Sequence, residues 1–282
     1  MELLPGMRND CEEGNISWFP ERQKTLIDII SERKPKNLIQ IGFNMGHSAL
    51  LICDIISQMK NNNNYGDDPV SIHVFDICEH ECTIPNFNIL AEEAKKQNIY
   101  LNLIPGSSLE TVPRFMMSND LLFDFIEIDG CHTFQCLIED VMNTVPRLKV
   151  GGIVYIDDYM STKAPIPSVN KGIDTINWEG FNTWYIDGAF WAEKKESNIT
   201  NEKIMSENYE HVNHPSHYGG ETNPYEAIKV IDAWDLGFSL GNTVKYISRA
   251  GKKGNDKELQ DLKKALWYLQ HHIEQLENEI KS

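Results

Sequence analysis

Short apolar runs typical of buried strands alternate with helix-length segments along the first part of the chain. In chain order, these runs read NLIQIG, VSIHVFD, IYLNLIPG, LLFDFIEID and GGIVYIDD. The segments between them are long enough for helices, and Pro20 is well placed as the first residue of an earlier helix. This alternation predicts an α/β fold, in which a mostly parallel sheet carries helices on both faces.

Residues 179–194 differ in character from the preceding repeats. Two aromatic-rich runs are joined there by Asp187-Gly188, a strong hairpin signal, so we expect a C-terminal antiparallel hairpin. The aromatic side chains are more typical of a hairpin core than of a substrate platform, although one or two could line an acceptor pocket. They are Trp178, Phe181, Trp184, Tyr185, Phe190 and Trp191.

Beyond residue 195 the pattern becomes first polar and then helical. Residues 196–210 hold few large apolar side chains and are predicted to be a linker between domain 1–195 and domain 211–282. Helices are expected at 223–235, 239–250 and 256–280, which makes the second domain a small all-α unit. The longest helix carries apolar residues in register, which favours a homo-oligomer: Leu259, Leu262, Leu266, Leu269, Ile273, Leu276 and Ile280.

Composition narrows the class of protein. With 41% hydrophobic residues, the 282-residue chain can build a substantial core. A net charge of −16 argues against extended nucleic-acid binding and favours small-molecule ligands. No apolar run is long enough to span a membrane, and the acidic start lacks signal-peptide order. Together with six cysteines read as reduced thiols, these features predict a cytoplasmic protein, in the host cytoplasm if it is viral.

Three carboxylates and one imidazole stand at the ends of two consecutive strand-like runs. Asp129 ends one run and His132 follows it, while Asp157 and Asp158 end the next. Neighbouring parallel strands would bring these groups together in the crevice where open α/β sheets bind ligands. Clustered carboxylates repel one another unless a cation or protons compensate, which suggests a metal site. The simpler alternative is a loop start and a helix cap, with His132 on a helix surface.

A second group of candidates lies at the ends of the earlier strands. Gly42 and Gly46 flank a turn between strand and helix, where the backbone can approach a ligand. Asp76 ends the second strand, where a carboxylate could accept ribose hydroxyls. Ser107 and Ser108 follow the third. Singly, each of these residues is more often an ordinary turn or cap, but their order raises the odds of a nucleotide-containing cofactor.

The segments IQIGFNMGHS, HVFD, GSSLETVP, FDFIEIDGCH and LKVGGIVYIDDY resemble those of class I S-adenosylmethionine-dependent methyltransferases. The resemblance covers residues 37–193 and is nearest to metal-dependent O-methyltransferases such as macrolide-sugar methyltransferases. It implies a Rossmann-like methyltransferase sheet, S-adenosylmethionine as cofactor, Mg²⁺ or another divalent cation, and a small hydroxylated acceptor.

The resemblance also implies a role for each matched position. Gly42 and Gly46 would flank the methionine part of the cofactor, Asp76 would hold its ribose, and Ser107 or Ser108 would lie near the adenine. The other implied positions are metal ligands at Asp129, Asp157 and Asp158, a general base at His132, and further cofactor contacts at Gln40 and Ser48. Gln40 departs from the family, which usually has an acidic residue there, yet an amide can still hydrogen-bond the cofactor.

Two other kinds of chemistry are weaker candidates. The sequence Cys78-Glu-His80-Glu-Cys82 offers three zinc-type ligands, but no second cysteine pair follows at a suitable spacing. Cys131 and Cys136 flank the proposed base and could be nucleophiles, although cysteine is more often a small buried apolar residue.

The segments HVNHPSHYGG, GFSLGNTVKYISRAGKKG and DLKKALWYL resemble a small phage-encoded domain family of largely unknown function. One member is the nucleotide kinase of short-tailed coliphages. His217, Lys245, Arg249 and Lys252 are candidate nucleotide ligands, and the alternative is a solvated helix end. No glycine-rich phosphate loop is present.

Three functions therefore stand side by side. The first is a viral or phage methyltransferase acting on a nucleotide, nucleoside or sugar, with an accessory nucleotide-binding domain. The second is a nucleotide kinase or nucleotide-binding protein that the first domain regulates. The third is a non-enzymatic protein that sequesters the cofactor or a nucleotide.

Overall fold

The computed structural model describes residues 3–8, 19–160, 166–197, 199–200, 204, 225, 227–250 and 258–281, with side chains as far as residue 277. The chain forms two compact units, Met1–Glu207 and Asn208–Ser282. Most of the predicted linker lies outside the described residues.

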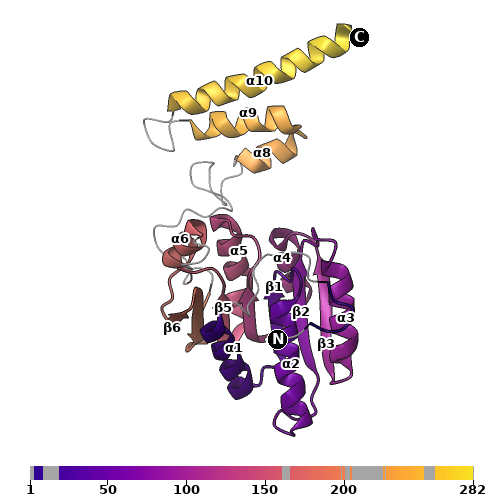
Figure 1. Cartoon of the computed structure of the whole chain (residues 1–282). Helices are drawn as coiled ribbons and strands as arrows, with labels where there is room; N and C mark the ends of the chain where they lie inside the picture. The colour runs from indigo at the N-terminus through magenta and orange to yellow at the C-terminus, as the bar shows by residue number, and fades with distance from the viewer. Residues whose placement is uncertain are drawn as a thin grey trace. The chain divides into compact units, whose positions relative to one another are not determined.

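The N-terminal unit is built around a seven-stranded sheet in the order β3-β2-β1-β4-β5-β7-β6 (Figure 1). Its strands are β1 (Asn37–Ile41), β2 (Val70–Asp76), β3 (Ile99–Pro105), β4 (Phe123–Ile128), β5 (Leu148–Ile156), β6 (Phe181–Ile186) and β7 (Ala189–Lys194). The first five are parallel, and β7 and β6 close the sheet in antiparallel pairing. The predicted mostly parallel, Rossmann-like sheet with a C-terminal hairpin is confirmed.

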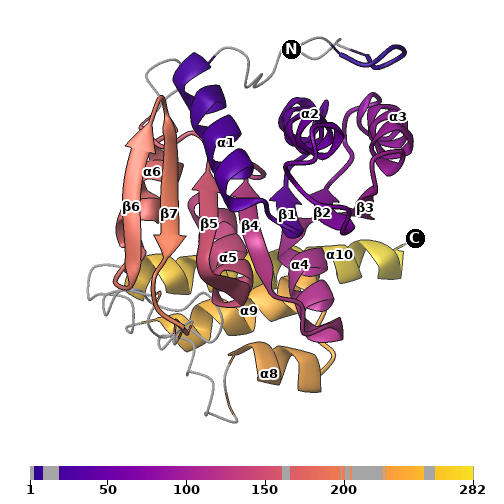
Figure 2. The same cartoon turned by 90° about the horizontal axis from the view of Figure 1, so that it is seen from below.

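Helices cover both faces of this sheet. They are α1 (Pro20–Arg33), α2 (His47–Asn61), α3 (Thr83–Lys95), α4 (Ser108–Ser118), α5 (Phe134–Thr144) and α6 (Pro167–Thr175), with the short 3₁₀ helix η2 (Val145–Arg147) before β5. Contacts link α1 to α2 and α2 to α3 on one face, and α4 to α5 and α5 to α6 on the other (Figure 2). Burial from both faces favours apolar side chains in these strands, and Gln40 of β1 and Glu127 of β4 are buried polar exceptions.

The order in which the chain adds strands to the sheet reverses between β1 and β4. From β1 it builds outward through β2 to β3, then returns to place β4 on the other side of β1. Open α/β sheets bind ligands at such a switch point, outside the carboxyl ends of the strands. The fold therefore places the ends of β1 and β4 at the centre of the expected crevice.

The C-terminal unit contains α8 (Ala227–Ala233), α9 (Phe238–Arg249) and α10 (Glu258–Lys281), as the predicted all-α unit requires. The predicted N-cap Asn223 lies outside the described residues. Tyr268 of α10 stacks on Tyr246 of α9 at 5.8 Å between ring centroids and meets Phe238 edge-on. Aromatic contacts of this kind hold the two longer helices together in a unit with a small core.

Candidate active site at the switch point

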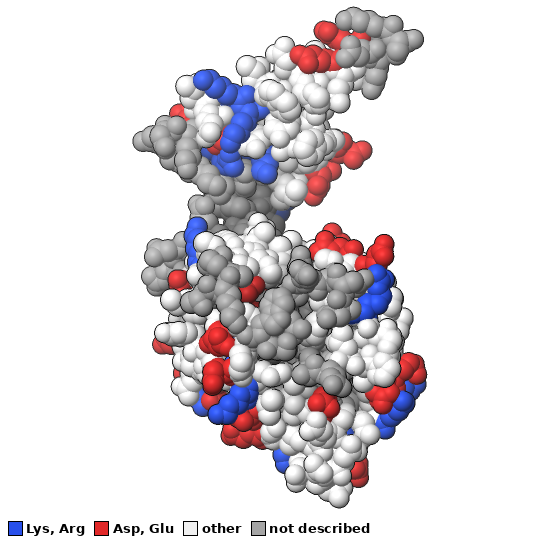
Figure 3. Space-filling view, in the orientation of Figure 1, with Lys and Arg blue, Asp and Glu red and all other residues white. Residues whose placement is uncertain are grey.

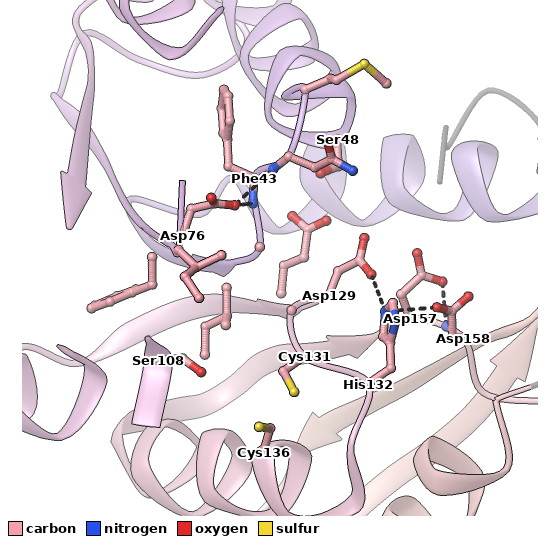
Figure 4. A pocket seen from close by; sticks show the side chains of 18 of the residues that line it. Phe43, Ser48, Asp76, Ser108, Asp129, Cys131, His132, Cys136, Asp157 and Asp158 are labelled. Atoms are coloured by element: carbon pink, nitrogen blue, oxygen red, sulfur yellow. Dashed lines mark hydrogen bonds and ion pairs between the residues drawn. The ribbon is translucent and has the colours of Figure 1, made fainter. Parts of the chain in front are cut away.

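A cavity of about 780 Å³ lies at the carboxyl ends of the parallel strands (Figure 4). The predicted residues that line it are Gly42, Ser48, Asp76, Ser107, Ser108, Asp129, His132, Asp157 and Asp158. Gln40, within β1, and Gly46, at the N-cap of α2, do not line it. One cavity thus brings together most residues of both predicted groups.

Gly42 is required for the shape of this turn. Its φ of +89° is disfavoured for other residues, and a Cβ atom there would lie 1.9 Å from the carbonyl oxygen of Asp129. The end of β1 therefore passes directly against the end of β4. Gly46 also has a positive φ, of +86°, and a Cβ there would meet the Phe43 ring at 2.4 Å. The chain's own packing explains both glycines, with or without a ligand.

Asp76 holds the turns after β1 and β2 together. One carboxylate oxygen accepts hydrogen bonds from the backbone N–H groups of Phe43 (2.6 Å) and Asn44 (3.0 Å), and the other accepts one from Cys78 (2.6 Å). An ionised carboxylate offers about four acceptor positions, so about one remains for a ribose hydroxyl. The structure thus gives Asp76 the turn-stabilising role that was the alternative to the predicted ribose contact.

The remaining predicted cofactor residues fall into two places. Gln40 donates from Nε2 to the hydroxyl of Ser48 at 2.7 Å, beside the cavity. Ser107 precedes the first turn of α4 and Ser108 begins it, after Gly106 at the end of β3. The side chain of Ser107 makes no capping hydrogen bond to this helix.

Asp129, His132 and Asp158 form one cluster. His132 Nε2 lies 3.1 Å from Asp158 Oδ2 and 3.6 Å from Asp129 Oδ1. Each residue offers a ligand atom, and these atoms lie within 4.8 Å of one another, close enough to share one metal ion. Asp158 adopts the left-handed conformation, with a φ of +62°, as the chain turns out of β5 toward His132.

Asp157, the third predicted metal ligand, is engaged elsewhere. It forms an ion pair with Arg22 of α1, whose side chain is 2% exposed. Arg22 also donates from Nε (3.2 Å) and from its terminal nitrogen (2.8 Å) to the carbonyl oxygen of Asp187 in the β6–β7 turn. Sequence reasoning missed Arg22, although the helical period places it on the same face as the buried Leu26 and Ile30.

The electrostatics of the cluster follow from burial and proximity. Burial and the nearby Asp157 raise the pKa of Asp129 to about 7, and burial with Asp157 raises that of Asp158 to about 6. The Asp129 carboxylate 3.6 Å away raises the pKa of His132 to about 8, against the effect of burial. These carboxyl groups are crowded enough that a bound cation would relieve their repulsion.

Glu127 is a second residue that the sequence reasoning missed. It lies on β4, lines the cavity and is 1% exposed. Burial and the nearby Asp129 raise its pKa to about 8, and a cation placed against it would favour the ionised form. The available signal was a second acidic residue, after Asp124, within the strand-like run FDFIEI.

The alternative chemistries are less well supported by the geometry. Among the described residues, the clustered ligand atoms are those of Asp129, His132 and Asp158, and Cys78–Cys82 contributes no such group. Cys136 is buried, as expected of a small apolar side chain, whereas Cys131 is exposed.

Residues 39–159 match the family model described as a methyltransferase domain. Among solved structures, the chain is similar to CalS11, a TDP-rhamnose 3′-O-methyltransferase of calicheamicin biosynthesis. The two share 15% identity over 61% of this chain and 80% of that one, with a TM-score of 0.49. It is also similar to an O-methyltransferase from Bacillus cereus in complex with SAH, with 14% identity over 62% of this chain and 81% of that one and a TM-score of 0.45. A further similar structure is TomG from Streptomyces achromogenes in complex with SAM, with 13% identity over 68% of this chain and 84% of that one and a TM-score of 0.46. No curated protein matches the chain.

Residues 212–270 match a family described as a protein of unknown function (DUF3310). That description names no activity, so the expected kinase activity gains no support from it. Of the candidate nucleotide ligands in this domain, His217 and Lys252 lie outside the described residues. Lys245 and Arg249 lie on α9, and Figure 3 shows Lys and Arg side chains gathered on one side of this unit.

Arg249 is held by an acidic partner on the next helix. Its Nε donates to Asp261 Oδ2 at 2.9 Å and its terminal nitrogen to Oδ1 at 2.5 Å, in a two-point pair between α9 and α10. The side chain of Asp261 is 3% exposed, so the pair is largely shielded from water. The structure therefore gives Arg249 a structural role beside the predicted phosphate contact.

We expect Arg249→Ala to destabilise the C-terminal unit by about 2–3 kcal/mol, because it removes the two-point pair with the buried Asp261 carboxylate. Denaturant unfolding followed by circular dichroism would measure this loss. Lys263→Ala, an exposed change on α10, is the control and should cost under about 0.5 kcal/mol. Equal small losses for both variants would contradict a structural role for the pair.

Proposed function

We propose that the protein is an S-adenosylmethionine-dependent methyltransferase that methylates a hydroxyl oxygen of a small acceptor. The observation that carries this proposal is one cavity at the β1–β4 switch point. It joins the Gly42 turn and Asp76 on one side to the Asp129–His132–Asp158 cluster on the other. The match of residues 39–159 to a methyltransferase domain supports it.

The cluster fits a divalent cation, with Mg²⁺ as the first candidate. Asp129 and Asp158 would hold the ion, while Arg22 neutralises Asp157 and keeps that carboxylate apart. A bound cation would orient the acceptor oxygen and lower the pKa of its hydroxyl. Because carboxylates suit Mg²⁺ and Mn²⁺ whereas imidazole suits softer metals, the role of His132 decides which ion binds best.

His132 is the proposed general base. Its ring lies against both carboxylates of the cluster and is half-exposed to the cavity. In the neutral form it would accept the acceptor's hydroxyl proton as the oxygen bonds to the methyl carbon. The carbon–sulfur bond breaks in the same step, leaving S-adenosylhomocysteine and an imidazolium stabilised by Asp129 and Asp158. Holding the two reactants in line would supply much of the remaining rate acceleration.

The acceptor is proposed to be a nucleotide, nucleoside or sugar. The support is the second domain, which we propose binds nucleotides through the basic side of α9 and α10. Arg249 and Lys264 lie together over the Tyr246 ring (4.9 and 5.4 Å), and grouped cations of this kind suit a nucleotide phosphate. The alternative functions of the protein are a nucleotide kinase or nucleotide-binding protein regulated by the first domain, or a protein that sequesters the cofactor or a nucleotide.

Calorimetry with S-adenosylmethionine and S-adenosylhomocysteine, each with and without Mg²⁺, tests the methyltransferase proposal. We expect both ligands to bind, and methyl transfer to appear when a panel of nucleotides, nucleosides and sugars is screened with S-adenosylmethionine. Failure of both ligands to bind would overturn the proposal. Cofactor binding with no transfer to any acceptor would favour sequestration.

We further propose that the protein forms a homo-oligomer through α10. Six apolar residues at alternating spacings of three and four are 38–63% exposed on this helix, and they form the seam typical of a coiled coil. They are Leu259, Leu262, Leu266, Leu269, Ile273 and Leu276.

None of the described helices is both long and apolar enough to cross a membrane.

Leu266→Glu is expected to convert the oligomer to a monomer, because it places a charge in the centre of the α10 seam. Sedimentation velocity measures the change in mass. Lys264→Glu, two positions away along the same helix, is the control and should leave the mass unchanged. A wild-type protein that sediments as a monomer at micromolar concentration would contradict this proposal.

A further inference from the structure

Glu127 is a buried acid without a partner in the described part of the chain. It is 1% exposed, and neither carboxyl oxygen makes a hydrogen bond there, although the Ser48 hydroxyl is near enough to moderate its charge. A buried acceptor that lacks a donor is costly. Since Glu127 also lines the cavity, the natural source of the missing donor is a ligand.

The neighbours of Glu127 supply little of what it lacks, because the Ser48 hydroxyl can donate to only one of about four acceptor positions of a carboxylate. In the sheet, Glu127 lies between Gln40 of β1 and Tyr155 of β5. The amide N–H of Gln40 is directed to Ser48, and its carbonyl oxygen is a second buried acceptor without a partner among the described residues. The nearby cation Arg22 is bound to Asp157 and to the Asp187 carbonyl.

The position of Glu127 along the sheet edge narrows the kind of ligand group. The ends of β3, β2 and β1 carry, in spatial order, the residues proposed to face adenine, ribose and methionine. Next comes β4, which carries Glu127 and, two residues later, Asp129 of the metal cluster. The methionine end of a cofactor laid along this edge would therefore reach Glu127.

We propose that Glu127 accepts hydrogen bonds from the α-ammonium group of the cofactor's methionine part, and so selects ligands that carry a cationic amine there. This inference rests on the proposed function. An ammonium brings three N–H donors and a positive charge to a carboxyl group that lacks both. The sulfonium is the other cation of S-adenosylmethionine, but its methyl group must face the acceptor beside His132. The ammonium is therefore the cation that can face the buried Glu127.

The role also accounts for the amide at position 40. Gln40 provides no negative charge, whereas Glu127, opposite it on β4, does. The chain thus carries its acid on β4, across the switch point, while Gln40 orients Ser48.

The test compares two ligands in wild type and Glu127→Gln, by calorimetry on the full chain. S-Adenosylhomocysteine carries the ammonium and no sulfonium, and 5′-methylthioadenosine carries neither. We expect Glu127→Gln to weaken S-adenosylhomocysteine about tenfold or more, because a charged hydrogen bond is lost. Binding of 5′-methylthioadenosine should change less than about twofold, which also shows that the variant is folded. Glu92→Gln, an exposed change on α3, is the control and should alter neither ligand.

Each other outcome overturns the inference. Equal weakening of both ligands would mean that Glu127 only shapes the cavity, and no weakening of either would mean that it does not contact the ligand. If the affinity for S-adenosylmethionine, measured as a third ligand, falls while that for S-adenosylhomocysteine does not, Glu127 faces the sulfonium. If wild type fails to bind S-adenosylhomocysteine, both the inference and the proposed function fall, whereas binding by wild type leaves the proposed function standing.

Discussion

Replacing His132 by alanine is expected to lower kcat for methyl transfer by about 10²–10⁴-fold, the usual contribution of a positioned general base. The affinity for S-adenosylhomocysteine should stay within about twofold, because His132 lies on the metal side of the cavity and away from the Gly42 turn. The rate is measured with an acceptor found by screening, and the affinity by calorimetry. His271→Ala, on α10, is the control of the same residue type.

The same variant distinguishes a base from a metal ligand. If His132 is the base, the affinity for Mn²⁺ should fall by less than about tenfold in His132→Ala, while Asp129→Asn and Asp158→Asn should each weaken it more strongly. If His132→Ala loses the ion as completely as the two aspartate variants do, His132 is a ligand and the base must be sought elsewhere. Electron paramagnetic resonance of free Mn²⁺ gives this affinity without an acceptor.

Replacing Arg22 by methionine is expected to destabilise the N-terminal unit by about 3–5 kcal/mol. The change keeps much of the side-chain volume but leaves Asp157 unpaired beside two other carboxylates and removes both hydrogen bonds to the Asp187 carbonyl. Denaturant unfolding measures the loss. Added Mg²⁺ should recover part of it, because the ion would offset the charge that Arg22 no longer balances.

Arg33→Met is the matched control for this prediction. Arg33 lies on the same helix and pairs with Glu193 at 3.2 Å, but its side chain is 38% exposed. An exposed pair contributes little, so we expect a loss of under about 1 kcal/mol. A similar small loss for Arg22→Met would contradict a structural role for its buried ion pair.

The sequence predicted the sheet well because strands buried on both faces leave a clear signal. Their apolar runs are bounded by turns, and their ends carry Asp76, Asp129 and Asp158. The order of the last two strands in the sheet could not be predicted from the sequence. Asp187-Gly188 indicates a hairpin, but whether β6 or β7 pairs with β5 depends on packing that no local pattern records.

The site was predicted in part for a related reason. Spacing along adjacent strands placed Asp129, His132 and Asp158 near one another, but it could not separate Asp157 from Asp158. That distinction depends on Arg22, which lies 135 positions before Asp157 in the chain. Likewise, the backbone bonds that occupy Asp76 come from the turn after another strand. Contacts between distant segments are the part that a single sequence leaves open.

Arg22 links α1 to the β6–β7 turn, and this link affects how the protein can be divided into fragments. The matched methyltransferase segment begins at residue 39 and ends at 159, so a fragment cut to those limits would lack both α1 and the hairpin. It would keep every proposed metal ligand and yet lose the guanidinium that separates Asp157 from them. A fragment that keeps the proposed site intact should therefore run from before Pro20 to beyond Lys194, well outside the matched segment 39–159.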